Sequence, residues 1–367
     1  MYFYRYKRNN MGGNIFGKAL TLITFGESHG IAVGGVLDGF PAGIDIDADF
    51  IQQRLNARRP GQSRLTTRRD ESDKIEILSG VFENKSLGTP IAFLIRNKDV
   101  RPEDYEHVKM VYRPSHADYT YEKKYGIRDY RGGGRASARE TAARVAAGAF
   151  AMLLLDKHGI KITAWTSGIG TVSTGIAGFD ASDIEKSPVR CPDEEASEKM
   201  IKLLEETEKD GDTLGGTVSC LIKGVPPSLG EPVFDKLNAE LSKAMMSINA
   251  VKGFETGDGF GMAMKKGSEV NDLFINKNGK IRTETNHSGG IQGGISNGED
   301  IFFRVAFKPV PTIMKPQKTV DREGNETILI NKGRHDVCVV PRAVPVVEAM
   351  AALVLADHLL RNTTSRQ

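Results

Sequence analysis

The N-terminal third of the chain alternates short apolar runs with turn-forming residues, which is typical of strands joined by tight turns. The segment 47–59 differs, because Phe50, Ile51 and Leu55 lie at helical spacing and the pattern stops at Pro60 and Gly61. We therefore expect a helix in that segment. Strands are expected at 19–25, 31–37, 75–82 and 90–96.

The rest of the chain continues to mix strand and helix patterns. A helix is expected to start at Ser137, because Glu140 follows three residues later as in a capping box, and to stop at Gly159. The two prolines of 308–312 exclude a helix there. Further strands are expected at 160–165, 216–223 and 300–307, and further helices at 193–209, at 232–246 and through Val346, Met350, Leu353 and Leu360.

No repeat, low-complexity tract or linker interrupts this interleaving of strands and helices. One α/β or α+β domain is therefore favoured over two, and we expect it to span 13–361. The first ten residues, MYFYRYKRNN, are basic, and Met11 could serve as an alternative start. We expect 1–12 to be a disordered extension and 362–367 to be a C-terminal tail.

The composition is that of an ordinary soluble protein, with 367 residues of which 39% are apolar and 26% charged. The net charge is only +3, so a strong positive field requires local clustering of arginines and lysines. The apolar run 146–155 is too short to span a bilayer, and the N-terminus lacks the apolar core of a signal peptide. We expect a cytoplasmic protein with no membrane partner.

The three cysteines, Cys191, Cys220 and Cys338, are widely spaced and form no CxxC pair. They predict reduced thiols and no zinc site. Histidine–carboxylate spacing typical of other metal sites is also missing, so we expect no metal cofactor.

A run of three glycines, Gly132 to Gly134, leads directly into the helix expected from Ser137. Such a turn leaves backbone N–H groups free at the positive end of a helix dipole, which suits an anion. Four arginines, a histidine and several tyrosines surround the turn in sequence, so an anion or cofactor site is favoured over a plain solvated loop. The arginines are Arg131, Arg135, Arg139 and Arg144.

The motif GESHG at 26–30 matches the G-x-S-x-G elbow of serine hydrolases around Ser28. That elbow requires a helix after the nucleophile, whereas the apolar run 31–37 predicts a strand. A hydrolase is therefore a minor alternative.

Three histidines lie in polar, glycine-flanked loops with arginines nearby: His29, His116 and His335, the last followed by Asp336. Histidine suits proton transfer near neutral pH, and loop arginines bind phosphate or carboxylate groups through charge-assisted hydrogen bonds. The set predicts a site for a small, highly anionic substrate. Nucleic acid is the competing partner for the arginine cluster at 58–69, but the near-neutral net charge and scarcity of interleaved aromatic residues disfavour it.

Seven motifs occur in an order that resembles the chorismate synthase family over about 13–361. They are TFGESHG, RRPGQSR, RPSHADYTYEKKYGIRDYRGGGRASARET, SINAVKGFETGDGF, NHSGGIQGGIS, KPVPT and GRHD. The resemblance implies an α+β fold of the β-α-β sandwich type, with helices between antiparallel sheets. It also implies a homotetramer.

The resemblance further implies a carbon–oxygen lyase that removes phosphate from 5-enolpyruvylshikimate 3-phosphate to give chorismate, the last step of the shikimate route to aromatic amino acids. The family uses reduced FMN although the reaction has no net redox change. Such a cofactor carries the difficult chemistry while the protein orients it and excludes water. A substrate with two carboxylates and a phosphate also explains the need for several arginines.

Residue roles transfer motif by motif. The resemblance implies that His29 protonates the leaving phosphate, His116 stabilises the reduced flavin, and Asp336 helps flavin N5 accept the substrate proton. The implied substrate contacts are Ser28, Arg58, Arg64, Arg113, Arg139 and Arg334, of which Arg58 and Arg64 could instead contact NADPH. The implied FMN contacts are Arg135, Ala136, Ser137, Asn249, Ala250, Gly293, Lys308, Pro309, Val310, Pro311, Thr312 and Arg334.

Two parts of the chain depart from the family pattern: Ser115, and the decapeptide before Met11, to which we assign no function. Ser115 stands where the family often has glycine, which requires a negative φ or a mildly left-handed backbone at that position. No reductase segment is visible, so we expect a monofunctional enzyme. Its reduced FMN, or the electrons for it, would come from an external reductase, with NADPH as an indirect source.

Overall fold

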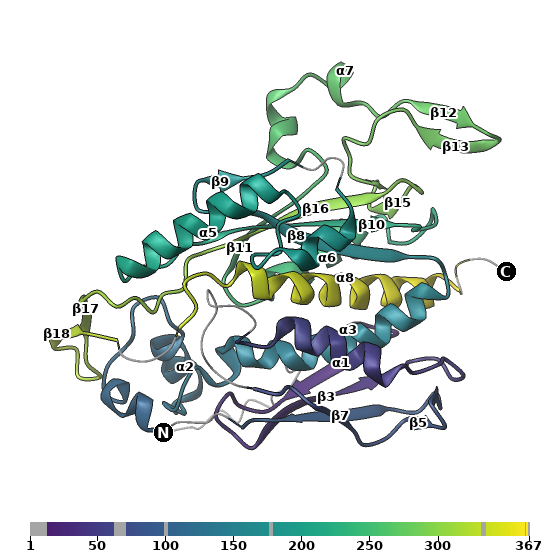
Figure 1. The fold of residues 1–367 in the computed structure, drawn as a ribbon. Coiled ribbons are helices and arrows are strands. Elements are labelled where there is room, and N and C mark those ends of the chain that lie inside the picture. The colour runs from purple at the N-terminus through teal and green to yellow at the C-terminus, as the bar shows by residue number, and fades with distance from the viewer. Residues whose placement is uncertain are drawn as a thin grey trace, which may run out of the picture.

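The computed structural model describes residues 13–61, 71–98, 102–175, 179–331, 335–363 and 365. Two five-stranded sheets enclose a layer of helices between them (Figure 1). Every strand pair in both sheets is antiparallel. The expected α+β sandwich is thereby confirmed.

The first sheet is built from the N-terminal strands, and its inner face packs on the helix layer. On β2 (Thr21–Phe25), Leu22 is buried while Ile23 and Phe25 are exposed, because successive side chains point to opposite faces. Strand order is β1 (Ile15–Phe16), β2, β3 (Ala32–Asp38), β7 (Ile91–Arg96) and β4 (Ile75–Ile77), and the hairpin β5 (Val81–Phe82)–β6 (Lys85–Ser86) lies beside the sheet.

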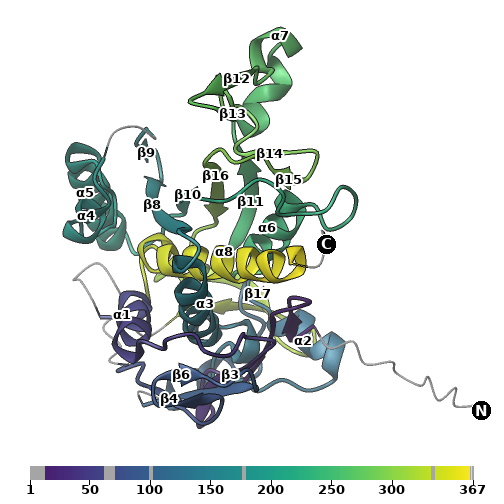
Figure 2. The same cartoon turned by 90° about the vertical axis from the view of Figure 1, so that its right-hand side faces the viewer.

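The second sheet comes from the middle of the chain and covers the opposite side of the helices (Figure 2). Its centre, β10 (Gly216–Lys223), has the bounds expected from the alternating pattern. Strand order is β11 (Val251–Thr256), β16 (Ile301–Phe307), β10, β8 (Lys161–Ile169) and β9 (Val172–Ser173).

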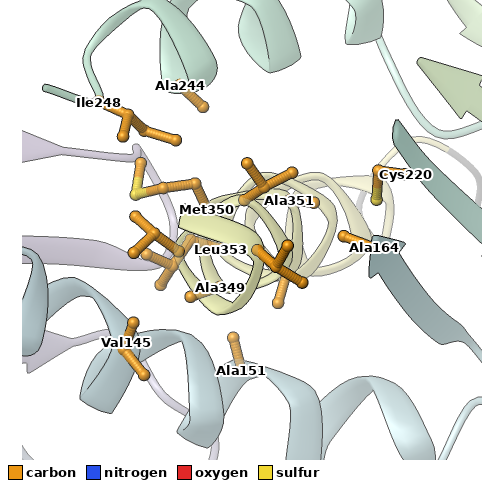
Figure 3. Close-up of a cluster of buried hydrophobic side chains, with 14 of the residues drawn as sticks. Val145, Ala151, Ala164, Cys220, Ala244, Ile248, Ala349, Met350, Ala351 and Leu353 are labelled. Atoms are coloured by element: carbon orange, nitrogen blue, oxygen red, sulfur yellow. The ribbon is translucent and has the colours of Figure 1, made fainter. Parts of the chain in front are cut away.

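The helix layer is centred on α8 (Val340–Asn362), which is apolar all around because it is covered on all sides. By length and composition it could cross a membrane, but 89% of that apolar stretch is buried inside the protein, as in a core helix. Figure 3 shows α8 with α3 (Thr141–Asp156) on one side and the second sheet on another. The labelled core residues are Val145, Ala151, Ala164, Cys220, Ala244, Ile248, Ala349, Met350, Ala351 and Leu353.

Gly148 of α3 allows the two central helices to approach closely. A Cβ atom built there would lie 2.4 Å from Ala349 Cβ and 2.5 Å from its Cα. No real side chain has such contacts, so the interhelical distance depends on the missing side chain.

The helix start expected at Ser137 is corrected by the structure. A short 3₁₀ turn, η3 (Ala138–Glu140), precedes α3, and Ser137 Oγ accepts from Arg139 N at 3.3 Å instead of capping the third residue. The Glu140 carboxylate pairs with Arg144 at 2.8 Å, so the reciprocal capping box is not formed.

Three other expected bounds also change. The segment 75–82 splits into β4 and β5, and the helix expected from 232 starts at Leu237 as α6 (Leu237–Met246). β8 extends to Ile169, beyond the expected 165. The remaining elements are α1 (Ala48–Arg58), α2 (Asp118–Tyr125), α4 (Ala181–Lys186), α5 (Glu194–Lys209), α7 (Gly267–Val270), η1 (Pro102–Val108), η2 (Gly134–Ala136), η4 (Gly259–Met264), β12 (Phe274–Lys277), β13 (Lys280–Thr283), β14 (Ile291–Gln292), β15 (Ile295–Ser296), β17 (Gln317–Val320) and β18 (Glu326–Leu329).

Candidate active site

A cavity of about 920 Å³ lies where the glycine-rich turn, the N-terminal ends of α3 and α8, and the loop after β16 meet. In Figure 1 these helix ends lie at the left of the helix layer, next to α2. The sequence motifs that carry the lining span more than half the chain, so only the fold brings them together. Of the expected site residues, those lining the cavity are Ser28, Arg58, Arg113, His116, Arg135, Ala136, Ser137, Arg139, Asn249, Ala250, Lys308, Val310, Pro311, Thr312 and Asp336.

Five expected site residues are not in that lining. Gly293 lies in the turn between β14 and β15, and Pro309 lies between two residues that do line the cavity. His29 lies immediately behind the cavity wall, in contact with Ser28. Arg64 and Arg334 fall outside the described residues.

His29 is held in a tight buried setting, with 7% of its surface exposed. Its Nδ1 lies 3.1 Å from Ser28 Oγ, and its ring packs edge-on against Tyr105 at 4.8 Å between centroids. A Cβ at Gly132 would lie 2.4 Å from His29 Nδ1, and φ there is +104°. The first glycine of the triple-glycine turn is therefore required for the close approach of backbone to this imidazole.

The serine-hydrolase alternative loses its structural support. GESHG connects β2 to β3, so a strand follows Ser28 where a nucleophile elbow needs a helix.

Both ring nitrogens of His116 are engaged by the protein. Nδ1 lies 3.0 Å from the Pro114 carbonyl oxygen, and Nε2 lies 3.1 Å from Thr312 Oγ1. Because a carbonyl can only accept, Nδ1 carries the proton and Nε2 accepts from the Thr312 hydroxyl. Burial, reinforced by the nearby Arg113 guanidinium, lowers the pKa of His116 from 6.5 to about 4, so the ring is neutral at pH 7.

Ser115 has the left-handed backbone that a glycine would adopt more readily, with φ of +58°. Its carbonyl oxygen accepts a hydrogen bond from Lys308 Nζ at 3.0 Å. The chain thus keeps the expected geometry next to His116, at the cost of a serine in a strained conformation.

Arg113 is pre-paired with the aspartate of its own motif. Its Nε and Nη2 donate to the two Asp118 oxygens at 2.8 and 2.7 Å, and Arg128 also contacts Asp118 at 3.1 Å. These contacts hold the guanidinium in one orientation, and Nη2 also donates to the Gly132 carbonyl at 3.2 Å.

Arg58 and Arg139 share a single buried carboxylate, that of Asp73. Arg58 Nη2 donates to Asp73 Oδ2 at 2.7 Å, and Arg139 Nη1 donates to Asp73 Oδ1. Burial alone would raise the pKa of Asp73, but the two arginines outweigh it and hold the pKa below its ordinary value. The carboxylate is therefore ionised and neutralises part of the arginine charge.

Asp336 also has a basic partner, Arg342 of α8, which donates to its Oδ2. Both side chains line the cavity. Burial lowers the pKa of Arg342, and the Asp336 carboxylate partly opposes that shift.

Arg135 and Lys308 are cations of the cavity that no carboxylate within the described residues pairs with. Arg135 Nη2 donates to Thr24 Oγ1 at 2.6 Å and to the Thr24 carbonyl. Burial and then the neighbouring Lys252 lower the pKa of Lys308. Together with the arginine pairs that share Asp73 and Asp118, these two side chains add positive charge to the cavity, which favours an anionic ligand.

Asn249 presents a buried acceptor that has no donor among the described residues. Its Nδ2 donates to the Ala136 carbonyl at 2.8 Å, while its Oδ1 receives no hydrogen bond. The next residue, Ala250, has φ of +70°, a left-handed conformation costly for alanine. An unsatisfied acceptor and a strained backbone at a cavity wall are both typical of a ligand site.

Sequence reasoning missed several residues that shape this site. Asp73, Asp118 and Arg342 hold the expected arginines and Asp336, and Tyr105 packs on His29. The sequence contained little indication of these roles. An acidic residue shortly after an arginine cluster, such as Asp73, is equally compatible with an exposed, solvated charge.

The fold and the cavity together are typical of an enzyme whose site, rich in arginines, takes a small anionic substrate. The family model for chorismate synthase matches residues 20–360. Chorismate synthase of Christiangramia forsetii is 59% identical over 358 residues, covering 97% of this chain and 100% of that protein. Chorismate synthase of Parabacteroides distasonis is 59% identical over 355 residues, covering 96% and 99%. A crystal structure of chorismate synthase superposes with a TM-score of 0.77 at 34% identity, covering 95% of this chain and 94% of that one.

The chain therefore belongs to the chorismate synthase family. It is accordingly a lyase of the shikimate pathway, as the resemblance implied.

Proposed function

We propose that the cavity eliminates phosphate from 5-enolpyruvylshikimate 3-phosphate to give chorismate, with reduced FMN bound beside the substrate. The observation that carries this proposal is the convergence of His116, Asp336 and the paired arginines on one cavity of about 920 Å³, with His29 behind its wall. A polyanion and a planar cofactor together need a site of that size and charge.

The substrate anions would bind to arginines whose orientation is already fixed. Four of the five N–H groups of Arg58 donate to protein acceptors, so it offers at most one to a ligand. Arg139 and Arg113 line the same cavity. Arg64 and Arg334 complete the proposed set, and an NADPH contact at Arg58 and Arg64 is the alternative use of those two. Because the guanidiniums need not reorganise, binding energy is available for orienting the reacting atoms.

His29 would donate the proton to the leaving phosphate. Its contact with Ser28 fixes the ring, and Gly132 keeps the turn against it. Asp336, held by Arg342, would take part in receiving the proton removed from the substrate at one of its carboxylate oxygens.

Two features of the cavity are compatible with FMN: a hydrogen-bond acceptor that lacks a donor, and positively charged side chains. Asn249 Oδ1 needs a donor, and flavin ring N–H groups are donors. Lys308 and Arg135 supply positive charge for an anionic reduced ring or its phosphate, and 308–312 supply a non-helical wall. When bound, the reduced flavin supplies electron density to the allylic system and recovers it later.

His116 would respond to that cofactor through its protonation. The ring is neutral at pH 7 in this structure, so an anionic neighbour would raise its pKa and favour the imidazolium. Thr312 Oγ1 can then accept from Nε2, because a hydroxyl acts as donor or acceptor.

The first experiment is anaerobic turnover of 5-enolpyruvylshikimate 3-phosphate with photoreduced FMN, followed by phosphate release and chorismate absorbance. An aerobic sample with oxidised FMN is the control. We expect product only with reduced flavin. Equal turnover in the oxidised control would overturn the FMN proposal, and absence of product from a folded, flavin-binding protein would overturn the activity.

We also propose that the electrons come from an external reductase, with NADPH as their indirect source. The supporting observation is that the chorismate synthase family model accounts for residues 20–360. If the purified chain alone bleached oxidised FMN with NADPH in the dark, the proposal would be wrong.

We infer a homotetramer from two separate apolar surfaces. The first is the outer face of the first sheet, where Ile23 is 42% and Phe25 45% exposed. The second is the projecting arm 259–283, where Phe260 is 81% and Phe274 68% exposed (Figure 2). Two self-complementary interfaces are what a tetramer with dihedral symmetry needs.

We infer a cytoplasmic location from the cysteines. Cys191, Cys220 and Cys338 are all buried and free. Burial also raises the pKa of Cys220 and Cys338, to about 12 for the latter, so the thiols are unreactive.

A further inference from the structure

Asp73 lies directly behind the two arginines that the proposed function assigns to the substrate. It is 0% exposed and does not line the cavity, whereas Arg58 and Arg139 both do. Its two oxygens are divided between them, Oδ2 accepting from Arg58 Nη2 at 2.7 Å and Nε at 3.2 Å, and Oδ1 accepting from Arg139 Nη1. One carboxylate thus sets the spacing of two guanidiniums.

The other contacts of the two arginines come from different elements. Arg58 Nη1 donates to the Ala138 carbonyl and to Thr141 Oγ1, each at 3.2 Å, at the start of α3. Arg139 Nε donates to Asn97 Oδ1 at 2.6 Å and Nη2 to the Arg96 carbonyl at 3.1 Å, at the end of β7. Asp73 contacts both arginines directly, so it links α1, which carries Arg58, to η3, which carries Arg139, at the cavity wall.

The charges around this pair are close to balanced. Glu71 lies 3.8 Å from Arg139 Nη2, and Arg342 donates its Nε to the Arg58 carbonyl at 3.3 Å. Without the Asp73 charge, Arg58 and Arg139 would repel each other in a buried setting, where such repulsion is weakly screened.

The backbone at position 73 also restricts the residue type. Its φ is +45°, a left-handed value that aspartate and asparagine tolerate better than most residues. A short carboxylate on a left-handed backbone is therefore what this position requires.

We propose that Asp73 is a positioning residue for the elimination: it fixes Arg58 and Arg139 in the spacing that receives two anionic groups of the substrate. This inference rests on the proposed function, because it takes both arginines to be substrate contacts.

The test is Asp73→Asn, which keeps the side-chain size and the tolerance of a left-handed backbone. The amide can accept from one arginine only, and its NH₂ group faces the other, so the spacing is lost while the cavity becomes one charge more positive. Positioning predicts that KM for 5-enolpyruvylshikimate 3-phosphate rises, with kcat/KM falling about 10- to 100-fold. If Asp73 served only to reduce positive charge, Asp73→Asn would bind the anionic substrate more tightly and KM would fall. A lower KM in this variant would overturn the proposal.

Asp73→Glu is the second variant and keeps the charge while displacing the carboxylate. We expect it to raise KM as well, and wild-type KM in a folded Asp73→Glu protein would contradict positioning. The dissociation constant for oxidised FMN, measured by flavin fluorescence, should stay unchanged in both variants.

Glu348→Gln is the matched control, since it breaks the partly buried Arg54–Glu348 ion pair, neither member of which lines the cavity. It should lower the thermal midpoint and leave KM unchanged, which separates positioning from loss of stability. Product formation by the wild type tests the proposed function independently. If the wild type is active and Asp73→Asn has normal kinetics, this inference alone fails.

Discussion

Three of the eight non-glycine residues with positive φ in the described part of the chain lie at the cavity. Ser115, Asp73 and Ala250 all have positive φ, at +58°, +45° and +70°. Each is next to or part of the proposed site, and strain of this kind persists only where the surrounding contacts hold it in place. At residue 115 the contact is the hydrogen bond from Lys308.

Ser115→Gly should therefore relieve strain. We expect the free energy of unfolding to rise by up to about 1 kcal/mol, because the left-handed penalty of about 1–2 kcal/mol is partly offset by the greater freedom of glycine in the unfolded chain. Urea unfolding measures this. Ser173→Gly, in β9 where φ is not positive, is the control and should lower stability; a loss of stability in both would contradict strain at Ser115.

His116 should make stability depend on pH. Its pKa is about 4 in the fold against 6.5 ordinarily, so between these values the unfolded chain binds the extra proton. Its contribution is fully present above pH 6.5 and is lost as pH falls toward 4. Between pH 7 and pH 5 we expect the wild type to lose about 2 kcal/mol more than His116→Gln. If the free energy of unfolding changed equally with pH in the two proteins, burial would not lower the pKa of His116.

Among the elements, the strands were predicted better than the helix starts. The runs expected at 216–223 and 300–307 match β10 and β16 closely, because each is a short, mostly apolar segment bounded by glycine, proline or charged residues. The starts of α3 and α6 were misplaced, since local 3₁₀ geometry and tertiary contacts decide where a helix begins.

The contact between α3 and α8 yields the prediction at this scale. Gly148→Ala places a methyl group 2.4 Å from Ala349 Cβ, so the helices must separate or shift. We expect a loss of about 1–3 kcal/mol in the free energy of unfolding, typical of overpacking. Gly267→Ala is the control, because a Cβ atom at residue 267 would have no heavy atom within 4 Å. This variant should be neutral or slightly stabilising. Thermal or urea unfolding compares the two, and equal stability of both variants would contradict the close helix contact.

For the whole molecule, the exposed apolar surfaces predict assembly. Light scattering of the wild type should give four times the chain mass of 40.1 kDa. We expect Phe25→Asp on the sheet face or Phe274→Asp on the arm each to halve that mass, because each removes one of two interfaces. Ile330→Asp, at an exposed site on neither surface, should leave it unchanged. A wild-type monomer, or tetramers in both interface variants, would refute the assignment.

The sequence was enough to predict the family, the alternation of strands and helices, and the chemical groups of the site, because these depend on residue type and short-range order. Tertiary structure decided which groups face one another. Asp73 between Arg58 and Arg139, and Thr312 against His116, join residues 15 to 196 positions apart. Charge pairing and burial, and with them the neutral state of His116, follow from distances in space that no local pattern in the chain records.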